Sequence, residues 1–186
     1  VQTCALPILR ELRHPLLLWQ QRHEGGAPVV PVSLRVGPEL RVVAITGPNT
    51  GGKTVTLKSL GLAALMARAG LFLPCAGTPS LPWCGLVLAD IGDEQSLQQN
   101  LSTFSGHIRR IARILTALGP GATANPPGHA MAEANATSAL LAAGEAGARP
   151  AGAALVLLDE VGAGTDPTEG AALAAALLRH LADRAR

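Results

Sequence analysis

The sequence predicts an α/β domain in which a mainly parallel sheet is flanked by helices. Three observations support this class. Strand-like and helix-like apolar patterns alternate along the chain, a glycine-rich turn joins a strand to a helix, and an acidic pair follows a buried strand. The 186 residues suffice for one domain, and a hydrophobic content of 48% supplies a core.

The composition excludes several classes of function. The formal net charge is only +2, so the chain lacks the polybasic character of a general nucleic-acid binder. Aromatic residues make up 2% and tyrosine is absent, which argues against a platform for base stacking. No apolar run approaches the roughly 20 residues of a membrane span, and no secretory leader is visible. Because the 3 cysteines follow no metal-binding spacing, we expect a reduced, cytoplasmic protein with no membrane partner.

The first predicted elements are extended. Residues 1–8 do not resemble the start of a domain, and we expect them to be non-native and to lie outside a fold that occupies residues 9–186. From Val29 to Val36, apolar side chains alternate with proline and polar residues, which predicts a strand of an N-terminal antiparallel element. Leu40 to Thr46 is a second, more apolar strand, which ends at Gly47.

Helices and strands then alternate. A helix is predicted from Lys53 to Ala69, and Gly70 supplies its natural end. The apolar face of that helix consists of Leu57, Leu60, Ala64 and Leu65. Leu86 to Ile91 is a third strand-like run. The apolar stripe of the next helix consists of Phe104, Ile108, Ile111, Leu115 and Leu118. Its spacing of four, three, four and three predicts core packing.

The last third of the chain begins with a segment that lacks a sustained period. Residues 119–152 are rich in alanine, glycine and proline, and we interpret them as a loop or insertion with at most a weak helix over residues 131–143. Ala154 to Leu158 is a buried strand. The last helix starts at Asp166-Pro167-Thr168-Glu169, which offers an N-cap, a proline at the first helical position and an acid in the first turn.

The most specific chemical motif is Gly47-Pro48-Asn49-Thr50-Gly51-Gly52-Lys53-Thr54, which matches G-x-x-x-x-G-K-[ST] between a strand and a helix. Such a loop points successive backbone N–H groups at phosphate oxygens, and its glycines permit close approach. The following helix presents its N-terminus to the anion. We therefore expect these eight residues to bind ATP, with Lys53 reaching the β- and γ-phosphates and Thr54 offering a hydroxyl to Mg²⁺.

An acidic pair completes the predicted site. The run Leu155–Leu158 delivers Asp159 and Glu160 at the C-terminal end of a strand, where α/β proteins bind ligands. Asp159 is placed to hold Mg²⁺ through water, and Glu160 to orient or deprotonate the attacking water.

The order of the two acids narrows the class. A catalytic glutamate directly after the Mg²⁺ aspartate suits the ABC-type ATPases, which pair two subunits so that a serine of one reaches the γ-phosphate bound by the other. The candidate serine is Ser102, in the sequence LSTFS at a predicted helix start. A plain helix N-cap explains this residue equally well.

Further segments carry a resemblance to one family. They are RHPL (13–16), GPNTGGKTVTLKSLGL (47–62), AGLFLP (69–74), ADIGDEQS (89–96), LSTFSGH (101–107) and LLDEVGAGTDPTEGAALA (157–174). Together they resemble the bacterial MutS paralogue family, the anti-recombination MutS-type endonucleases that carry a C-terminal Smr nuclease. Classical MutS typically reads GPNMGGKS and DEIGRGTS, so the sequence favours the paralogue. The resemblance covers about residues 10–118 and 153–185.

The resemblance implies a P-loop NTPase fold of the ABC/MutS type. It implies that Glu160 and Lys53 are catalytic and that Ser102 acts in trans within a homodimer. It makes Arg13-His14-Pro15 the strip near the adenine and Gly162–Asp166 the loop that crosses between two nucleotide sites. The chain would be the ATPase domain of a DNA-structure-binding protein that suppresses homologous recombination by acting on branched DNA, or that acts on stalled ribosomes, where the family has also been placed.

Departures from the family leave alternatives open. The DNA-contacting clamp, the final strands with their switch histidine, and the Smr nuclease would lie outside residues 1–186, so we expect a C-terminally truncated domain with an insertion at about 119–152. One alternative is another ABC-type ATPase, such as a transporter subunit. A transporter would usually show LSGGQ and a stacking aromatic before the phosphate loop, and the sequence has neither. The other alternative is a fragment that binds ATP without hydrolysing it.

Overall fold

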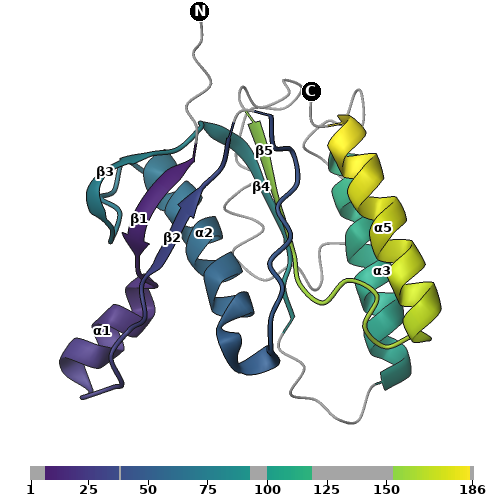
Figure 1. The fold of residues 1–186 in the computed structure, drawn as a ribbon, viewed down its shortest axis with the longest axis horizontal. Helices are drawn as coiled ribbons and strands as arrows, with labels where there is room; N and C mark the ends of the chain where they lie inside the picture. Colours follow the sequence, from purple (N-terminus) through teal and green to yellow (C-terminus); the bar gives the residue numbers. More distant parts are fainter. Residues whose placement is uncertain (1–6, 38, 93–99, 119–152, 185–186) are drawn as a thin grey trace, which may run out of the picture.

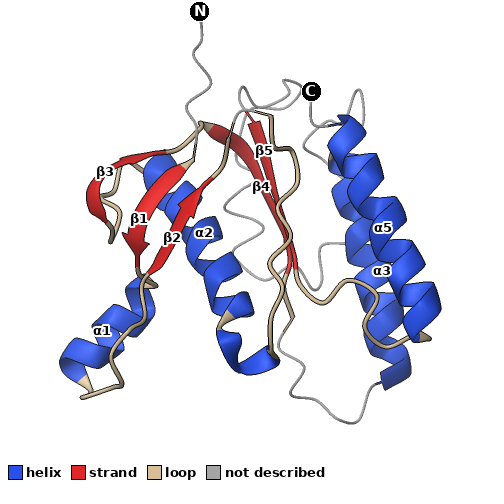
Figure 2. Ribbon diagram, in the orientation of Figure 1, coloured by secondary structure: helices blue, strands red, loops and turns tan. Residues whose placement is uncertain are grey.

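The computed structural model describes residues 7–37, 39–92, 100–118 and 153–184. The elements in chain order are β1 (Ile8–Leu12), α1 (Pro15–His23), β2 (Val32–Arg35), η1 (Asn49–Gly51), α2 (Lys53–Arg68), β3 (Ala76–Ser80), β4 (Cys84–Asp90), α3 (Asn100–Ala117), β5 (Ala153–Leu158) and α5 (Pro167–Arg184). Figure 2 distinguishes these helices from the strands. None of the helices in the described ranges is long and apolar enough to cross a membrane.

An antiparallel sheet with the strand order β2-β1-β3 forms the N-terminal part. Its central strand is anchored by Leu9, whose side chain is 1% exposed. The predicted antiparallel element is therefore confirmed, but its boundary was wrong. Ile8 pairs with Arg35 on one side and with Ser80 on the other, although we expected residues 1–8 to lie outside the fold. Residues 1–6 lie outside the described ranges.

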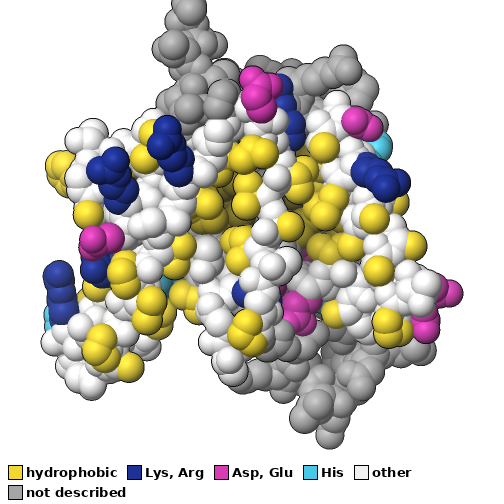
Figure 3. All heavy atoms as spheres, in the orientation of Figure 1, with side chains coloured by type: hydrophobic (Ala, Val, Ile, Leu, Met, Phe, Trp, Pro, Cys, Tyr) yellow, Lys and Arg dark blue, Asp and Glu magenta, His cyan; other side chains and the backbone are white. Residues whose placement is uncertain are grey.

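The parallel sheet is smaller than the sequence predicts. Among the described residues it consists of β4 and β5, which pair in parallel up to Asp90 and Leu158. The strand predicted over Leu40–Thr46 is wrong, because that segment forms no regular strand. Its apolar side chains remain at the surface, with Val43 49% and Ile45 37% exposed. Figure 3 shows hydrophobic side chains gathered in the centre of one face of the molecule.

Helices cover both faces of the parallel pair. In Figure 1, α2 lies on one side of β4 and β5, and α3 and α5 lie on the other. Helix α2 also packs against the antiparallel sheet, so it contributes to two hydrophobic clusters. The first cluster is centred on Leu9, Leu12 and Ala63, and the second on Ala64, Cys84 and Val87. Two adjacent small residues of α2 thus face different sheets, and their size permits close approach on both sides.

The ends of α2 and α5 follow the sequence signals. Gly70, with φ 71°, ends α2. The N–H groups of Leu71 and Gly70 bond to the carbonyls of Met66 and Ala67 at 2.9 and 3.1 Å, which is the Schellman pattern. At the start of α5, Asp166 Oδ1 accepts bonds from the N–H groups of the second and third helical residues at 2.9 and 3.3 Å. The predicted C-terminal glycine and N-cap are both confirmed.

The buried face of α3 differs from the predicted stripe. His107, Ile111 and Ile114 are buried, whereas Ile108 is 36% exposed. The helix is rotated about its axis so that His107 lies on its inner face, where its side chain bonds to Asp90. The insertion expected at 119–152 lies outside the described residues.

Candidate functional site

The glycine-rich loop, residues 47–54, curls immediately before α2. A short 3-10 turn, η1, is closed by a bond from the Gly51 N–H to the Pro48 carbonyl at 3.0 Å. Gly52 follows in the left-handed region with φ 74°, where a side chain would be strained, and α2 begins at the next residue. A Cβ atom built on Gly47 or Gly52 would have no neighbour within 4 Å. The loop therefore leaves open space beside the N-terminus of a helix, an arrangement suited to anions.

Lys53 is folded over this loop. Its Nζ donates hydrogen bonds to the carbonyl oxygens of Gly47 and Pro48, at 2.7 and 2.9 Å. The loop's cation therefore lies against the loop's own main chain, at the place where the motif predicts a phosphate.

Thr54 and Asp159 meet across 105 positions of sequence. The Thr54 hydroxyl donates to Asp159 Oδ2 at 2.5 Å, and Asp159 is 8% exposed. Asp159 stands directly after β5, and its N–H bonds to the Asp90 carbonyl at the end of β4 at 2.9 Å. The two residues predicted to hold Mg²⁺ are thus brought together at the carboxyl edge of the parallel strands.

Glu160 begins the loop that links β5 to α5. It is exposed, and its φ of 47° is unusual for a residue with a side chain. Strained backbone of this kind costs about 1–3 kcal/mol and is concentrated at functional sites. The turn closes with a bond from the Ala163 N–H to the Glu160 carbonyl at 2.9 Å. Gly162 then passes so close to Gly170 of α5 that a Cβ on Gly162 would lie 2.6 Å from the Gly170 carbonyl oxygen.

A cavity of about 360 Å³ adjoins the glycine-rich loop. Its lining includes Gly51, Gly52 and Val55 from the loop and α2, and His14 from the segment between β1 and α1. The His14 Nδ1 atom is buried and has no hydrogen-bond partner among the described residues. Burial, with a smaller effect of the positive charge of Lys58, lowers the pKa of His14 from its ordinary value of 6.5. The imidazole is therefore neutral at pH 7, with one ring nitrogen a hydrogen-bond donor and the other an acceptor.

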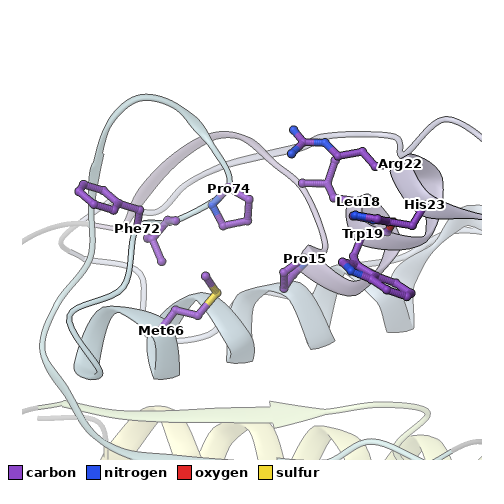
Figure 4. A pocket seen from close by; sticks show the side chains of 9 residues that line it. Pro15, Leu18, Trp19, Arg22, His23, Met66, Phe72 and Pro74 are labelled. Atoms are coloured by element: carbon purple, nitrogen blue, oxygen red, sulfur yellow. The ribbon is translucent and has the colours of Figure 1, made fainter.

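A second cavity, of about 330 Å³, lies at the other end of α2 (Figure 4). Its lining is mostly apolar and includes Pro15, Trp19, Met66 and Phe72. The Phe72 side chain is 98% exposed at its rim. None of the residues of the glycine-rich loop lines it, so this cavity is separate from the site.

A buried polar cluster that we did not predict from the sequence lies beside the site. The carboxylate of Asp90 accepts a bond from His107 Nδ1 at 2.8 Å and a second bond from Arg110 Nε. Both partners come from α3. A histidine in place of an apolar residue on the inner face of this helix was the available signal, and the predicted stripe passed over it.

One predicted site residue is not placed in the site by its side chain. Ser102 lies in the first turn of α3, the third residue of the helix as bounded, so the N-cap explanation does not fit it. The structure does not describe the side chain of Ser102.

Comparisons of the sequence with known proteins point to one class of domain. Residues 43–123, which include the glycine-rich loop, β4 and α3, match the MutS domain V family. This match identifies residues 43–123, which carry the glycine-rich loop, as part of a MutS-type domain.

Curated relatives narrow the class further. The chain is 60% identical over 182 residues to an endonuclease MutS2 of Synechocystis sp., a match that covers 95% of this chain and 20% of that protein. It is 46% identical over 173 residues to the one of Thermomicrobium roseum, covering 93% and 17%, and 45% identical over 186 residues to the one of Symbiobacterium thermophilum, covering 97% and 19%. The chain belongs to the MutS2 family, which confirms the resemblance. It spans about a fifth of the length of these relatives.

Proposed function

We propose that the chain is the ATP-binding and ATP-hydrolysing domain of a MutS2-type protein, with a P-loop NTPase fold of the ABC/MutS type. The observation that carries this proposal is the 2.5 Å contact between Thr54 Oγ1 and Asp159 Oδ2 at the N-terminus of α2. It joins the hydroxyl of the glycine-rich loop to the carboxylate after β5. These are the two protein groups that hold Mg²⁺ in such enzymes.

The donor atoms fit magnesium. Mg²⁺ prefers oxygen ligands and usually keeps several waters, with one or two carboxylates and the substrate phosphates completing its shell. Thr54 and Asp159 supply a hydroxyl and a carboxylate. Among the described residues no three His, Cys, Asp or Glu side chains form a ready metal cage, so phosphate and water would complete the shell. Bound there, Mg²⁺ would supply positive charge that offsets the charge of the phosphates.

Lys53 and the loop would hold the phosphates. When ATP binds, Lys53 Nζ would exchange the carbonyls of Gly47 and Pro48 for phosphate oxygens, a charge-assisted contact of greater strength. The released carbonyls can turn to water because the loop is exposed. Gly47 and Gly52 leave room for the anion to reach the backbone.

The cavity beside the loop would take the base and ribose. It adjoins Gly51 and Gly52, so a nucleotide with its phosphates in the loop can extend into it. His14 lines this cavity, and its neutral ring would contact the base. This favours a nucleotide over a simple phosphate as the ligand.

Hydrolysis would use Glu160 and a second chain. Glu160 stands next to Asp159 and would orient or deprotonate the attacking water. Ser102 would act in trans on the γ-phosphate of the partner in a homodimer. A lone chain would then lack part of the electrostatic stabilisation of the transition state. A chain that binds ATP without turnover is the alternative, and the comparisons favour the MutS class over a transporter subunit.

In the longer protein, we infer that ATP binding and hydrolysis switch a dimer that acts on branched DNA and suppresses recombination, or that acts on stalled ribosomes. The relatives are named endonucleases. We assign that activity to an Smr domain outside the matched fifth of those proteins.

Calorimetric titration of the chain with ATP and Mg²⁺ tests the proposal. We expect Lys53→Ala to lose a charge-assisted contact of roughly 1.5–3 kcal/mol, which weakens binding by about 10- to 150-fold. Arg68→Ala is the matched control, because Arg68 lies at the opposite end of α2, about 22 Å away at 1.5 Å per residue. Equal ATP affinity in wild type and Lys53→Ala would refute the phosphate-binding role of the loop.

A further inference from the structure

A buried ion cluster lies on the face of the parallel strands that is opposite the glycine-rich loop. The side chain of Asp90 at the end of β4 is 3% exposed, and it is held by His107 and Arg110 of α3. His107 Nδ1 lies 2.8 Å from Asp90 Oδ2 and 3.3 Å from Arg110 Nη2. The shorter contact is satisfied when Nδ1 carries the proton, because a carboxylate only accepts hydrogen bonds. Arg110 Nε donates to the other oxygen, so both oxygens of Asp90 are paired.

The same residue supports the metal edge through its main chain. The Asp90 carbonyl accepts the Asp159 N–H at 2.9 Å. Asp90 pairs with Leu158, so by strand alternation the next residue, Asp159, faces the other side of the sheet. The contacts agree with this, since Asp159 bonds to Thr54 of α2 while Asp90 bonds to α3.

Stability alone is a weak reason for such a cluster. Well-packed apolar residues in place of a buried ion pair are often neutral or stabilising. The cluster instead stands one hydrogen bond from the proposed Mg²⁺ ligand. Its two α3 residues follow Ser102 by five and eight positions on the same helix.

We propose that His107 and Arg110 are positioning residues for the metal-binding edge. Through Asp90 they fix the main chain that carries Asp159, and they hold against that edge the helix that carries Ser102. This inference rests on the proposed function. It adds that residues on the α3 side of the sheet hold the metal-binding edge in place. Groups that hydrogen-bond directly to a metal ligand typically contribute about 10- to 100-fold to metal affinity. Here the link runs through the main chain of Asp90, so we take the lower end of that range.

The test measures the affinity for ATP with Mg²⁺ and with EDTA, by calorimetry, together with the Tm of each variant. The wild-type chain is expected to bind ATP more tightly with Mg²⁺. We expect His107→Leu and Arg110→Gln to weaken Mg²⁺-dependent binding by roughly tenfold, while the affinity in EDTA changes by less than about twofold. His107→Asn keeps an N–H donor near the Nδ1 position and should stay close to wild type. Arg109→Gln is the matched control, an exposed neighbour on α3.

The outcomes separate the inference from the proposed function. If both affinities fall together in proportion to Tm, or if His107→Asn is as weak as His107→Leu, the cluster supports only the fold and the inference is wrong. If His107→Leu does not fold, Arg110→Gln decides, because its side chain is 44% exposed and its loss leaves no large cavity. A wild-type chain that binds no ATP under either condition would refute the proposed function, and the inference with it.

Discussion

Replacing Gly170 by alanine should destabilise the chain, although alanine is the better helix former. A Cβ atom on Gly170 would lie 2.5 Å from the Gly162 carbonyl oxygen and 3.3 Å from its carbonyl carbon. Real Cβ atoms essentially never approach other atoms within 3.0 Å. The obstacle is main chain, so no side-chain rotation relieves the contact, and α5 or the loop after Glu160 has to move.

The two opposing effects have known sizes. Glycine to alanine in a helix gains about 1 kcal/mol, whereas overpacking costs about 1–3 kcal/mol. With a backbone obstacle we take the upper part of that range, which leaves a net loss of about 1–2 kcal/mol. For a chain of this size, each kcal/mol changes Tm by roughly 2–4 °C, so Tm should fall by about 2–8 °C. Gly162→Ala should lose more, because its φ of 87° adds backbone strain to the same contact.

Thermal and urea unfolding followed by far-UV circular dichroism measure the effect. Gly106→Ala in α3 is the matched control, since a Cβ there would meet only Arg110 Nη1 at an ordinary 3.6 Å. That variant should gain stability from the helix effect alone. If Gly170→Ala is stabilised as much as Gly106→Ala, the close approach of the loop and α5 is wrong.

Two further predictions concern pH and turnover. Because burial lowers the pKa of His14 from 6.5, the unfolded chain binds more protons than the native chain below that pH, and stability should fall as pH drops through the lowered native pKa. His14→Gln should remove that part of the pH dependence, and an unchanged slope in urea unfolding would contradict the prediction. Specific ATPase activity should rise with protein concentration, Glu160→Gln should bind ATP without turnover, and mixing Lys53→Ala with Ser102→Ala chains should restore activity at one of two sites; flat specific activity from a protein that light scattering shows to be monomeric would rule out the composite site.

The sequence predicted those elements whose start and end depend on residues close together along the chain. Helix α2, its end at Gly70 and the start of α5 depend on caps and spacing within a few residues, and the sequence contains those signals. The sequence does not show in the same way which strand a segment pairs with. Leu40–Thr46 is as apolar as a strand, and β4 and β5 each keep one unpaired edge among the described residues, yet the segment forms no ladder with either strand. Apolar composition predicts a preference for burial without naming the partner.

Elements without a regular pattern were missed. Strand β3 contains Gly77 and Pro79, which both oppose strand formation, yet it lies at the edge of its sheet where proline is tolerated. Helix α1 has no buried residue, so no apolar stripe marks it, and Pro15 at its start was the only signal.

Within the site, too, the features set by neighbouring residues were predictable and those set by long-range packing were not. The conformation of the glycine-rich loop depends on the order and spacing of residues 47–54 themselves, and the sequence therefore predicted it. The meeting of Thr54 with Asp159 is a long-range contact that followed only from the expected parallel topology. The pairing of Asp90 with His107 could not be predicted, because it depends on how α3 is rotated about its axis, and one step of rotation exchanges Ile108 for His107 on the inner face.

The shared position of α2 between two sheets couples the two halves of the fold. Ala63 packs with Leu9 and Leu12 of the antiparallel sheet, and the adjacent Ala64 packs with Cys84 and Val87 of β4. Ile8 pairs with Ser80 and Asp90 pairs with Leu158, which are separated by 72 and 68 positions, so the entropy of loop closure favours neither sheet. Because both clusters share one helix, a change that displaces α2 from either sheet also disturbs the other. Thr54 lies on α2 and Asp159 directly follows β5, so a nucleotide bound between them would stabilise both sheets through this one helix.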